Sequence, residues 1–491
     1  MWKRTYISCI LHIGLVISMV DKMLLRCTSC GASYDFDINR KLCSRCGNGL
    51  TIELEPIRTF EPQQDAIGIW KYAAVLPSLD GEFRISLGEG NTSLHESKKI
   101  KREINVSRLW FKDETVEPTG SYLDRSSALF ASMALRLRCR NIVTYSTGNL
   151  GASLSAYSSK AGLGMQVYIK PGIDLGKLYQ MVAYGAEVKV VQSFKEKWGG
   201  IEDTAVATEY DPLINEAKKT IMWEVFYQLN RTLPDYIILP MGEGGLVYST
   251  FKALDELKAL NNLSSYITKI VGVQPDGCAP IVGAFEKGLD AVEPQNLPRT
   301  KIFDLNVTNP RFGNAALKAI RETGGFAVSI DGNEVLEATS TLAECEGVLA
   351  EPAASLTVAG LMKLRKTGEI SEDSNVVCVI TGSGLKDPRL MREIAHRRSN
   401  LGPLIEELSG NMLLGSTKSA ILKLLSEKEK YGYQIWKELR EKQNIDVKIP
   451  TVYQHLSKLI KEGYVKKTEP KTVLGRRREY YSLTDKGRAI A

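Results

Sequence analysis

The sequence lacks an apolar run long enough to cross a membrane, and its cysteines are sparse. The apolar stretch near the amino end, Tyr6–Val20, spans 15 residues, whereas a spanning helix needs roughly 20. Nine cysteines among 491 residues are an ordinary density, which excludes a disulfide scaffold, and the composition also excludes disorder and collagen-like repeats. A chain of this length is expected to form roughly three domains, with no membrane partner.

The first 26 residues are expected to be a leader outside the folded protein. Lys3 and Arg4 precede the apolar stretch, a pattern that resembles a secretory signal. A reduced-thiol motif and a DNA-binding pattern follow, and both are typical of intracellular proteins. We therefore interpret residues 1–26 as a mis-called start, with Met19 or Met23 as the true first residue, and expect a cytoplasmic protein.

The net charge of +7 is small, but it is concentrated at the carboxyl end. Residues 415–491 contain 18 Lys and Arg against 9 Asp and Glu, a net charge of +9. The rest of the chain is therefore close to neutral. A polyanionic partner is expected to bind the last 77 residues.

Two CxxC pairs near the amino end predict a metal site within residues 27–50. Two such pairs, each on a tight turn, place four thiolates around one ion and complete a tetrahedron. We expect a structural zinc ribbon that leaves no position open for catalysis, with a redox dithiol as the alternative. The expected ligands are Cys27, Cys30, Cys43 and Cys46.

Residues 51–398 alternate between short β-branched runs and helical stretches. This alternation is typical of an α/β body with a parallel sheet covered by helices. In such folds ligands bind where strand ends meet helix starts. The predicted strands are Asn141–Tyr145, Met165–Ile169, Glu187–Val191, Tyr236–Leu239, Ile270–Gln274 and Val376–Ile380.

Three strand-to-helix junctions in this body carry residues suited to ligand binding. Free amides and hydroxyls at a helix start suit a carboxylate or a ring oxygen, and a glycine-rich turn lets backbone N–H groups converge on a phosphate. Together the junctions predict one shared site. The candidate ligand residues are Ser146, Thr147, Gly148 and Asn149 in the first junction, Gly242, Glu243, Gly244 and Gly245 in the second, and Thr381 in the third.

The body resembles threonine synthase, a pyridoxal-phosphate enzyme of the tryptophan-synthase-β fold. The segments that carry the resemblance are Ser86–Thr92, Arg108–Glu114, Glu117–Ser121, Ser146–Asn149, Gly176–Met181, Glu351-Pro352 and Thr381–Pro388. The resemblance covers about 350 residues. It implies a two-subdomain body with a mixed or parallel sheet, in which residues of about 125–230 form the smaller subdomain. It also implies that Asn149 bonds the cofactor's ring hydroxyl, that Thr381 faces the pyridine nitrogen, and that the glycine loop holds the phosphate.

Two departures from that family pattern bear on activity. The family element Gly-Ser-Phe-Lys-Asp-Arg reads Gly-Ser-Tyr-Leu-Asp-Arg at residues 120–125, so Leu123 stands at the position of the Schiff-base lysine. An alkyl side chain neither bonds the cofactor nor moves protons. Glu243 replaces an Asn beside the glycines, and a carboxylate that points inward would repel a phosphate. We expect a retained pocket for an amino acid or phospho-amino acid without turnover; the alternative is a threonine synthase-like lyase that uses another lysine.

The last 77 residues predict a winged helix-turn-helix after a linker over residues 399–414. Helices are expected at Thr417–Leu425, at Tyr433–Arg440 and from Pro450 to about Glu462, followed by a hairpin with a turn near Leu474-Gly475. The pattern resembles the PadR-like regulators in Tyr431–Tyr433, Thr451–Tyr453 and Tyr481–Gly487.

The third helix is expected to enter the major groove of double-stranded DNA, as in other winged helices. A tip rich in arginine would grip phosphates or a minor groove. The candidate residues are Thr451, Gln454, His455 and Lys458 for base edges and Arg476, Arg477 and Arg478 for the wing. The sequence thus predicts a homodimeric transcription regulator whose body senses a small amino-acid-like effector; a threonine synthase with a regulatory tail is the alternative.

Overall fold

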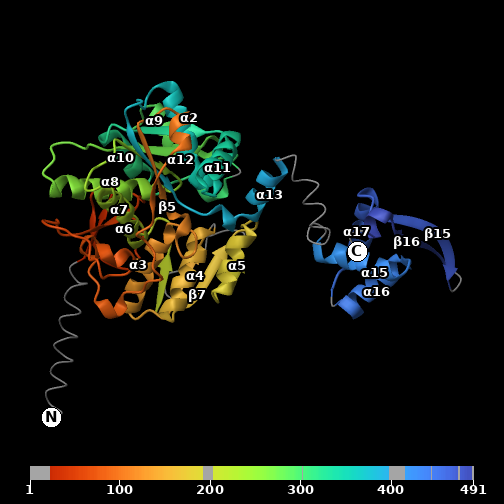
Figure 1. The fold of residues 1–491 in the computed structure, drawn as a ribbon. Coiled ribbons are helices and arrows are strands. Elements are labelled where there is room, and N and C mark those ends of the chain that lie inside the picture. Colours follow the sequence, from red (N-terminus) through yellow and green to blue (C-terminus); the bar gives the residue numbers. More distant parts are fainter. Residues whose placement is uncertain are drawn as a thin grey trace, which may run out of the picture. The chain divides into compact units, whose positions relative to one another are not determined.

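The computed structural model describes residues 23–146, 148–191, 203–300, 302–397, 415–443, 445–473 and 476–488. Residues 1–22 of the expected leader, Thr147, the expected linker 399–414 and the turn at 474–475 lie outside these ranges. Two compact units divide the chain, Met1–Arg392 and Glu393–Ala491 (Figure 1). No helix in the described part combines the length and the apolar character that crossing a membrane would need.

A small antiparallel sheet opens the first unit. Its strands are β1 (Leu24–Cys27), β2 (Ser33–Asp35) and β3 (Leu50–Glu53), in the order β2-β1-β3. Leu25, Leu50 and Ile52 are fully buried and join the main hydrophobic cluster of the body. The sheet is therefore packed into the same core as the α/β layers.

The larger sheet of the body has six strands in the order β12-β11-β10-β13-β5-β4. All neighbours run parallel except β4, which pairs antiparallel with β5. The strands are β4 (Leu94–Glu96), β5 (Arg108–Asp113), β10 (Tyr236–Pro240), β11 (Lys269–Pro275), β12 (Phe326–Ile330) and β13 (Asn375–Ile380). The central strands β10 and β13 are almost completely buried, as expected for parallel strands covered on both faces.

The smaller sheet has four parallel strands in the order β8-β7-β6-β9. They are β6 (Asn141–Tyr145), β7 (Gly164–Ile169), β8 (Glu187–Val190) and β9 (Thr204–Ala207). Both sheets together confirm the α/β class with mixed and parallel sheets. All six strands predicted in the body are present, whereas β4, β5, β9 and β12 were not predicted.

Eleven helices lie wholly in the described part of the body, and a further helix, α13, crosses the boundary between the two units along the chain (Figure 1). Local signals explain several of their ends: Asp211 caps α6 ahead of Pro212, Asp331 and Glu334 form a capping box on α11, and α4 ends at left-handed Gly162. The helices are α2 (Lys99–Glu103), α3 (Leu123–Arg136), α4 (Asn149–Ala161), α5 (Leu175–Ala183), α6 (Pro212–Lys218), α7 (Thr220–Gln228), α8 (Gly245–Leu260), α9 (Pro280–Glu286), α10 (Gly313–Glu322), α11 (Gly332–Glu346), α12 (Pro352–Thr367) and α13 (Pro388–Arg397). Short 3-10 turns lie at Gly68–Val75, Gly81–Phe83, Glu114–Val116, Asp276–Cys278, Phe303–Leu305 and Gly384–Lys386.

The second unit is a helix–helix–helix–hairpin fold, which confirms the winged helix-turn-helix. Its elements are α15 (Gly415–Glu427), β14 (Lys430–Tyr431), α16 (Gly432–Gln443), α17 (Ile449–Lys461), β15 (Val465–Val473), β16 (Arg476–Leu483) and α18 (Asp485–Arg488). Strand β14 was not predicted, and it completes an antiparallel sheet in the order β14-β16-β15. A separate hydrophobic cluster, which includes Leu424, Leu456 and Tyr481, forms the core of this unit.

Candidate ligand cavity, metal centre and nucleic-acid interface

The four cysteines predicted as metal ligands lie together at the amino end of the body. Their sulfur atoms are all within 4.8 Å of one another. The Sγ atoms of Cys27 and Cys46 are 3.4 Å apart, and those of Cys30 and Cys43 are 3.6 Å apart. A tetrahedral zinc with Zn–S bonds of about 2.3 Å places its sulfurs about 3.8 Å apart. The donor set and its spacing therefore fit zinc.

Glycines shape both turns of this cysteine cluster. Gly31 and Gly47 have φ values of +71°, a left-handed conformation that glycine adopts without strain. Their amides donate to the carbonyl oxygens of Cys27 and Cys43, respectively. Each turn thus brings the two sulfurs of its pair to the same side.

The ribbon that carries these cysteines is hydrogen-bonded to the body. Asn39 pairs with strand β9 through Thr204 O and Val206 N, at 2.9 and 2.8 Å. Lys41 forms an ion pair with buried Asp211, the cap of α6. A third contact joins Gly49 N to Arg311 O at 2.9 Å. Residues just after β9, the last residue of α6 and Arg311 all line one cavity.

A cavity of about 390 Å³ lies where the carboxyl ends of β6, β9 and β10 meet helix starts. This is the edge at which parallel α/β sheets bind ligands. Its walls come from segments that are distant in the sequence. The lining residues include Tyr122, Leu123, Asn149, Thr208, Glu209, Tyr210, Lys218, Gly242, Glu243, Gly244, Gly245, Asp304, Arg311, Glu351 and Thr381.

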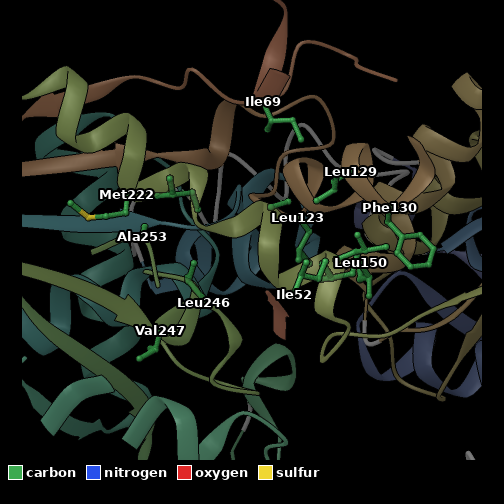
Figure 2. Packing of buried hydrophobic residues seen from close by; sticks show 14 of the residues in the cluster. Ile52, Ile69, Leu123, Leu129, Phe130, Leu150, Met222, Leu246, Val247 and Ala253 are labelled. Carbon is green, nitrogen blue, oxygen red and sulfur yellow. The ribbon is translucent and has the colours of Figure 1, made fainter. Parts of the chain in front are cut away.

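Leu123 is the first residue of α3 and forms part of the cavity wall. Its side chain is only 3% exposed and belongs to the main hydrophobic cluster, which also contains Leu150 and Phe130 (Figure 2). The structure thus places an alkyl group, packed into the core, at the position where the family resemblance expects an amine.

The Ser146–Asn149 junction is held by contacts within the protein. Ser146 does not line the cavity; its hydroxyl accepts hydrogen bonds from Gly148 N and Gly151 N, at 3.0 and 2.9 Å, and so satisfies the start of α4. The Asn149 side-chain amide faces the cavity and donates to Glu351 Oε2 at 2.8 Å. Thr147 lies outside the described residues.

Lys177 packs directly over this junction, which the sequence did not predict. A Cβ on Gly148 would lie 2.3 Å from Lys177 Cδ, so only glycine fits there. The ammonium of Lys177 is 2.6 Å from Asp304 Oδ2 and 3.1 Å from Glu351 Oε1. Although burial opposes the charge, these carboxylates raise the pKa of Lys177 and keep it protonated.

The glycine loop precedes α8 and turns through left-handed Gly244. A Cβ on Gly245 would lie 2.1 Å from Asn215 Oδ1, so the loop needs glycine there as well. Glu243 lines the cavity, and its carboxylate accepts a hydrogen bond from Arg311 N at 2.7 Å. Burial raises the pKa of Glu243 to about 7 against the effect of that hydrogen bond, so the group is partly neutral at physiological pH.

Glu209 and Lys218 line the same cavity as Glu243, and no sequence motif marked either of them. Burial raises the pKa of Glu209 and lowers the pKa of Lys218. No local signal predicts this grouping, because Glu209 follows β9 whereas Lys218 ends α6 and Glu243 follows β10. The cavity therefore holds groups of both charge signs, as a site for a zwitterion requires.

The cofactor implied by the resemblance, pyridoxal phosphate, is matched by some of these residues. Asn149 and Thr381 reach the cavity where its ring would lie, and the Gly242–Gly245 loop is shaped to approach a phosphate. When bound, the group supplies a reactive aldehyde and an electron-accepting ring. Leu123 does not supply the amine that would anchor it, so the fit covers the ring and the phosphate but not the covalent link.

Helix α17 of the second unit presents a polar face to solvent. Val452, Leu456 and Leu459 are buried, and the opposite face forms a shallow groove. Of the predicted contacts, Gln454 and Lys458 are exposed, and Thr451 and His455 are half-buried. The groove also includes residues that were not predicted, namely Pro450, Tyr453, Ser457 and Lys461; Tyr453 is 43% exposed.

The three arginines of the wing differ in their surroundings. Arg477 is exposed, whereas Arg478 is half-buried and its guanidinium lies 4.3 Å from the centre of the Tyr431 ring. Arg476 begins β16 and pairs in register with Val473. The exposed side chain of Arg477 is the one best placed for a phosphate.

Comparisons with known proteins agree with both units. The family model "Pyridoxal-phosphate dependent enzyme" matches residues 85–382, and the "Transcriptional regulator PadR-like family" matches residues 421–491. Threonine synthase of Methanosarcina acetivorans is 34% identical over 387 residues, which is 75% of this chain and 94% of that protein. Threonine synthase of Methanocaldococcus jannaschii is 35% identical over 380 residues, 74% of this chain and 93% of that protein.

Solved structures of more distant proteins share the fold of the body. Maize serine racemase has 18% identity and a TM-score of 0.53, and covers 63% of this chain and 92% of its own. Threonine deaminase isoform 2 of Solanum lycopersicum has 17% identity and a TM-score of 0.54, and covers 70% and 97%. The chain therefore belongs to the family of pyridoxal-phosphate dependent enzymes, as a threonine synthase-like member that ends in a PadR-like winged-helix domain.

Proposed function

We propose that the protein is a DNA-binding transcription regulator of the cytoplasm whose threonine synthase-like body senses a small amino-acid-like metabolite. The active form is a homodimer, since winged helices commonly read paired half-sites. Zinc in the cysteine cluster has a structural role. The observation that carries the proposal is the buried Leu123 in the cavity wall of a chain that also ends in a winged helix.

The cavity supports ligand recognition without turnover. Asn149 and Thr381 reach it, and Arg311 lines it together with Glu209 and Glu243. An amino acid carries one charge of each sign, so both ends of such a ligand find a partner there. With leucine at residue 123, the general acid–base and nucleophilic steps of the family have no amine at their usual position.

The second unit supports DNA binding through its charge and its exposed helix face. The net charge of +9 over residues 415–491 favours a polyanion. Gln454 and Lys458 extend from α17 into solvent, as a recognition helix requires. The pKa of His455 is lowered by partial burial and by neighbouring Lys418 and Lys458.

A threonine synthase with a regulatory DNA-binding tail is the second candidate. It is favoured by one observation, the 34% identity to a threonine synthase across 94% of that protein. It predicts release of inorganic phosphate from O-phosphohomoserine by the purified chain. The sensor predicts binding of such a compound with no phosphate release.

Sequence-selected DNA, obtained by rounds of selection with the full chain, provides the test. Binding is measured by fluorescence anisotropy at several salt concentrations, with and without amino acids and phospho-amino acids. Arg477→Ala is expected to weaken all sequences about equally and to reduce the salt slope by about 1. Gln454→Ala is expected to cost about 1–3 kcal/mol and to relax base preference at one position.

Lys437→Ala is a matched control for the loss of charge. Lys437 is exposed on α16, and its Nζ lies 3.8 Å from Glu441 Oε1. Its replacement by alanine therefore removes one positive charge from a helix other than α17. It should leave both affinity and base preference nearly unchanged. DNA binding that responds to no variant of α17 or the wing, or that no metabolite alters, would contradict the proposed function.

A further inference from the structure

The cavity contains a buried amine that no carboxylate neutralises at close range. Lys218 is the last residue of α6 and is only 2% exposed. Its Nζ donates to Asn215 Oδ1 at 2.9 Å and lies 5.6 Å from the centre of the Tyr122 ring. Tyr122 immediately precedes Leu123, so the amine reaches the cavity beside the segment from which the family's lysine is missing.

Most other buried lysines in the described part of the chain are held by ion pairs. Lys112 lies 2.7 Å from Glu224, Lys177 lies 2.6 Å from Asp304, and Lys219 lies 2.6 Å from Glu256. Such pairs keep an amine protonated and therefore unreactive. Within the described residues, Lys218 and Lys386 are buried without a carboxylate in ion-pair range, and only Lys218 lines the cavity.

We propose that Lys218 captures an aldehyde of the pyridoxal class in this cavity through a carbon–nitrogen double bond, in place of the lysine that Leu123 replaces. A lysine desolvated in a buried site is the arrangement that makes an amine nucleophilic near neutral pH. Burial lowers the pKa of Lys218, which increases the fraction of neutral amine and agrees with that arrangement.

The bond-forming step needs no oxidant or reductant. The neutral amine of Lys218 adds to the aldehyde carbon, and the aldehyde oxygen leaves as water with the two protons that the nitrogen gives up. A nearby acid must therefore give a proton to the aldehyde oxygen, and a nearby base must take a proton from the nitrogen. Glu243 lines the same cavity with a pKa raised to about 7 by burial, a value suited to giving and taking a proton at neutral pH.

This inference goes beyond the proposed function, because it assigns an aldehyde of the pyridoxal class to the same cavity beside the amino-acid-like effector. Its test detects a covalent bond to lysine and does not measure DNA binding. A negative result would therefore reject the covalent link without rejecting the proposed regulator. The purified full chain is incubated with pyridoxal phosphate near the protein concentration, reduced with borohydride, digested and mapped by mass spectrometry. Reduction adds hydride to the carbon and a proton to the nitrogen, which fixes any adduct at its lysine.

We expect the adduct at Lys218 in the wild-type chain, a result that requires no variant to fold. Lys218→Arg keeps the positive charge but forms no such bond, and should reduce specific labelling at least tenfold. Lys386→Gln is the matched control, because Lys386 is buried and unpaired but does not line the cavity; it should label as the wild type does.

Three results would overturn the inference. They are an adduct at Lys386, Lys177 or Lys170, labelling that persists unchanged in Lys218→Arg, and labelling spread over exposed lysines only. Circular dichroism and thermal unfolding of each variant separate a lost amine from a lost fold. Ligand-dependent DNA binding that survives in Lys218→Arg would leave the regulator intact and reject only the covalent link.

Discussion

Removing the metal from the cysteine cluster is expected to loosen two walls of the cavity. The ribbon contacts β9 through Asn39, and β9 leads directly into Thr208 and Glu209 of the cavity wall. On the other side Gly49 N bonds Arg311 O, while Arg311 N bonds the carboxylate of Glu243. A ribbon that unfolds without metal would break both connections at once.

The magnitude follows from the contacts that would be lost. The two hydrogen bonds of Asn39 and the one from Gly49 contribute about 0.5–1.5 kcal/mol each. Loss of Lys41 leaves Asp211, which is 1% exposed, without its ion-pair partner, and an uncompensated buried charge costs about 3–5 kcal/mol. We expect local relaxation to recover more than half of this total loss of free energy. The remaining loss of about 2–3 kcal/mol lowers the free energy of local opening and increases amide exchange about 30- to 150-fold.

Hydrogen exchange measured by mass spectrometry reports this effect segment by segment. The full chain is compared with and without a zinc chelator, and Cys30→Ser is compared with Cys345→Ser, which changes a partly buried cysteine outside the cluster. Faster exchange is expected in residues 204–210 and 309–314, and α17 should not change because its core is separate. Exchange that rises in residues 24–53 alone would refute a role for the ribbon in supporting the cavity.

Two further predictions concern buried charge in the body. The pKa of Glu243 is raised from 4.5 to about 7 by burial, so the folded chain holds a proton that the unfolded chain releases. The stability that this proton contributes is complete below pH 4.5 and is lost as the pH rises through 7. Glu243→Gln should therefore raise the free energy of unfolding in urea by about 1 kcal/mol at pH 5 and by about 3 kcal/mol at pH 8. An increase that does not grow with pH would contradict this. Arg125 is fully buried between Glu114 at 2.7 Å and Glu224 at 2.6 Å. Arg125→Met should lower the free energy of unfolding by about 3–5 kcal/mol in the same assay, because it leaves these carboxylates without their partner. A loss below 1 kcal/mol would show that the carboxylates find other partners.

Hydrophobic runs predicted those strands whose residues are nearly all β-branched or apolar. Strand β13 and strand β10 are of this kind, and both are buried on two faces. Strand β5 (Arg108–Asp113) carries charged residues at both ends, and β9 is four residues with two alanines, so neither has the composition of a strand. These two strands form through pairing with β13 and β6, which only the folded chain supplies.

Motifs predicted the segments of the cavity but not the contacts within it. The Asn149 and glycine-loop segments do reach the cavity, and the leucine at residue 123 is visible in the sequence alone. The partner of Asn149 is Glu351, and the partners of Lys177 include Asp304. These contacts join residues more than a hundred positions apart, and no periodicity or spacing encodes such a distance.

The polar contacts at Glu351 also lead from the cavity toward the second unit along the chain. Glu351 binds Asn149 and Lys177 through its side chain, and its backbone N donates to Gly382 O at 2.9 Å. Gly382 lies in the segment that follows β13 and continues into α13, the last described helix before the winged helix. A ligand that accepts the hydrogen bond of the Asn149 amide would compete with Glu351 Oε2 for it, and the backbone of Glu351 is bonded to the segment that leads into α13. Differential contacts of this kind are what a ligand needs to bias a conformational equilibrium, so under the proposed function Glu351 is the residue through which an effector would act on the segment that leads into α13.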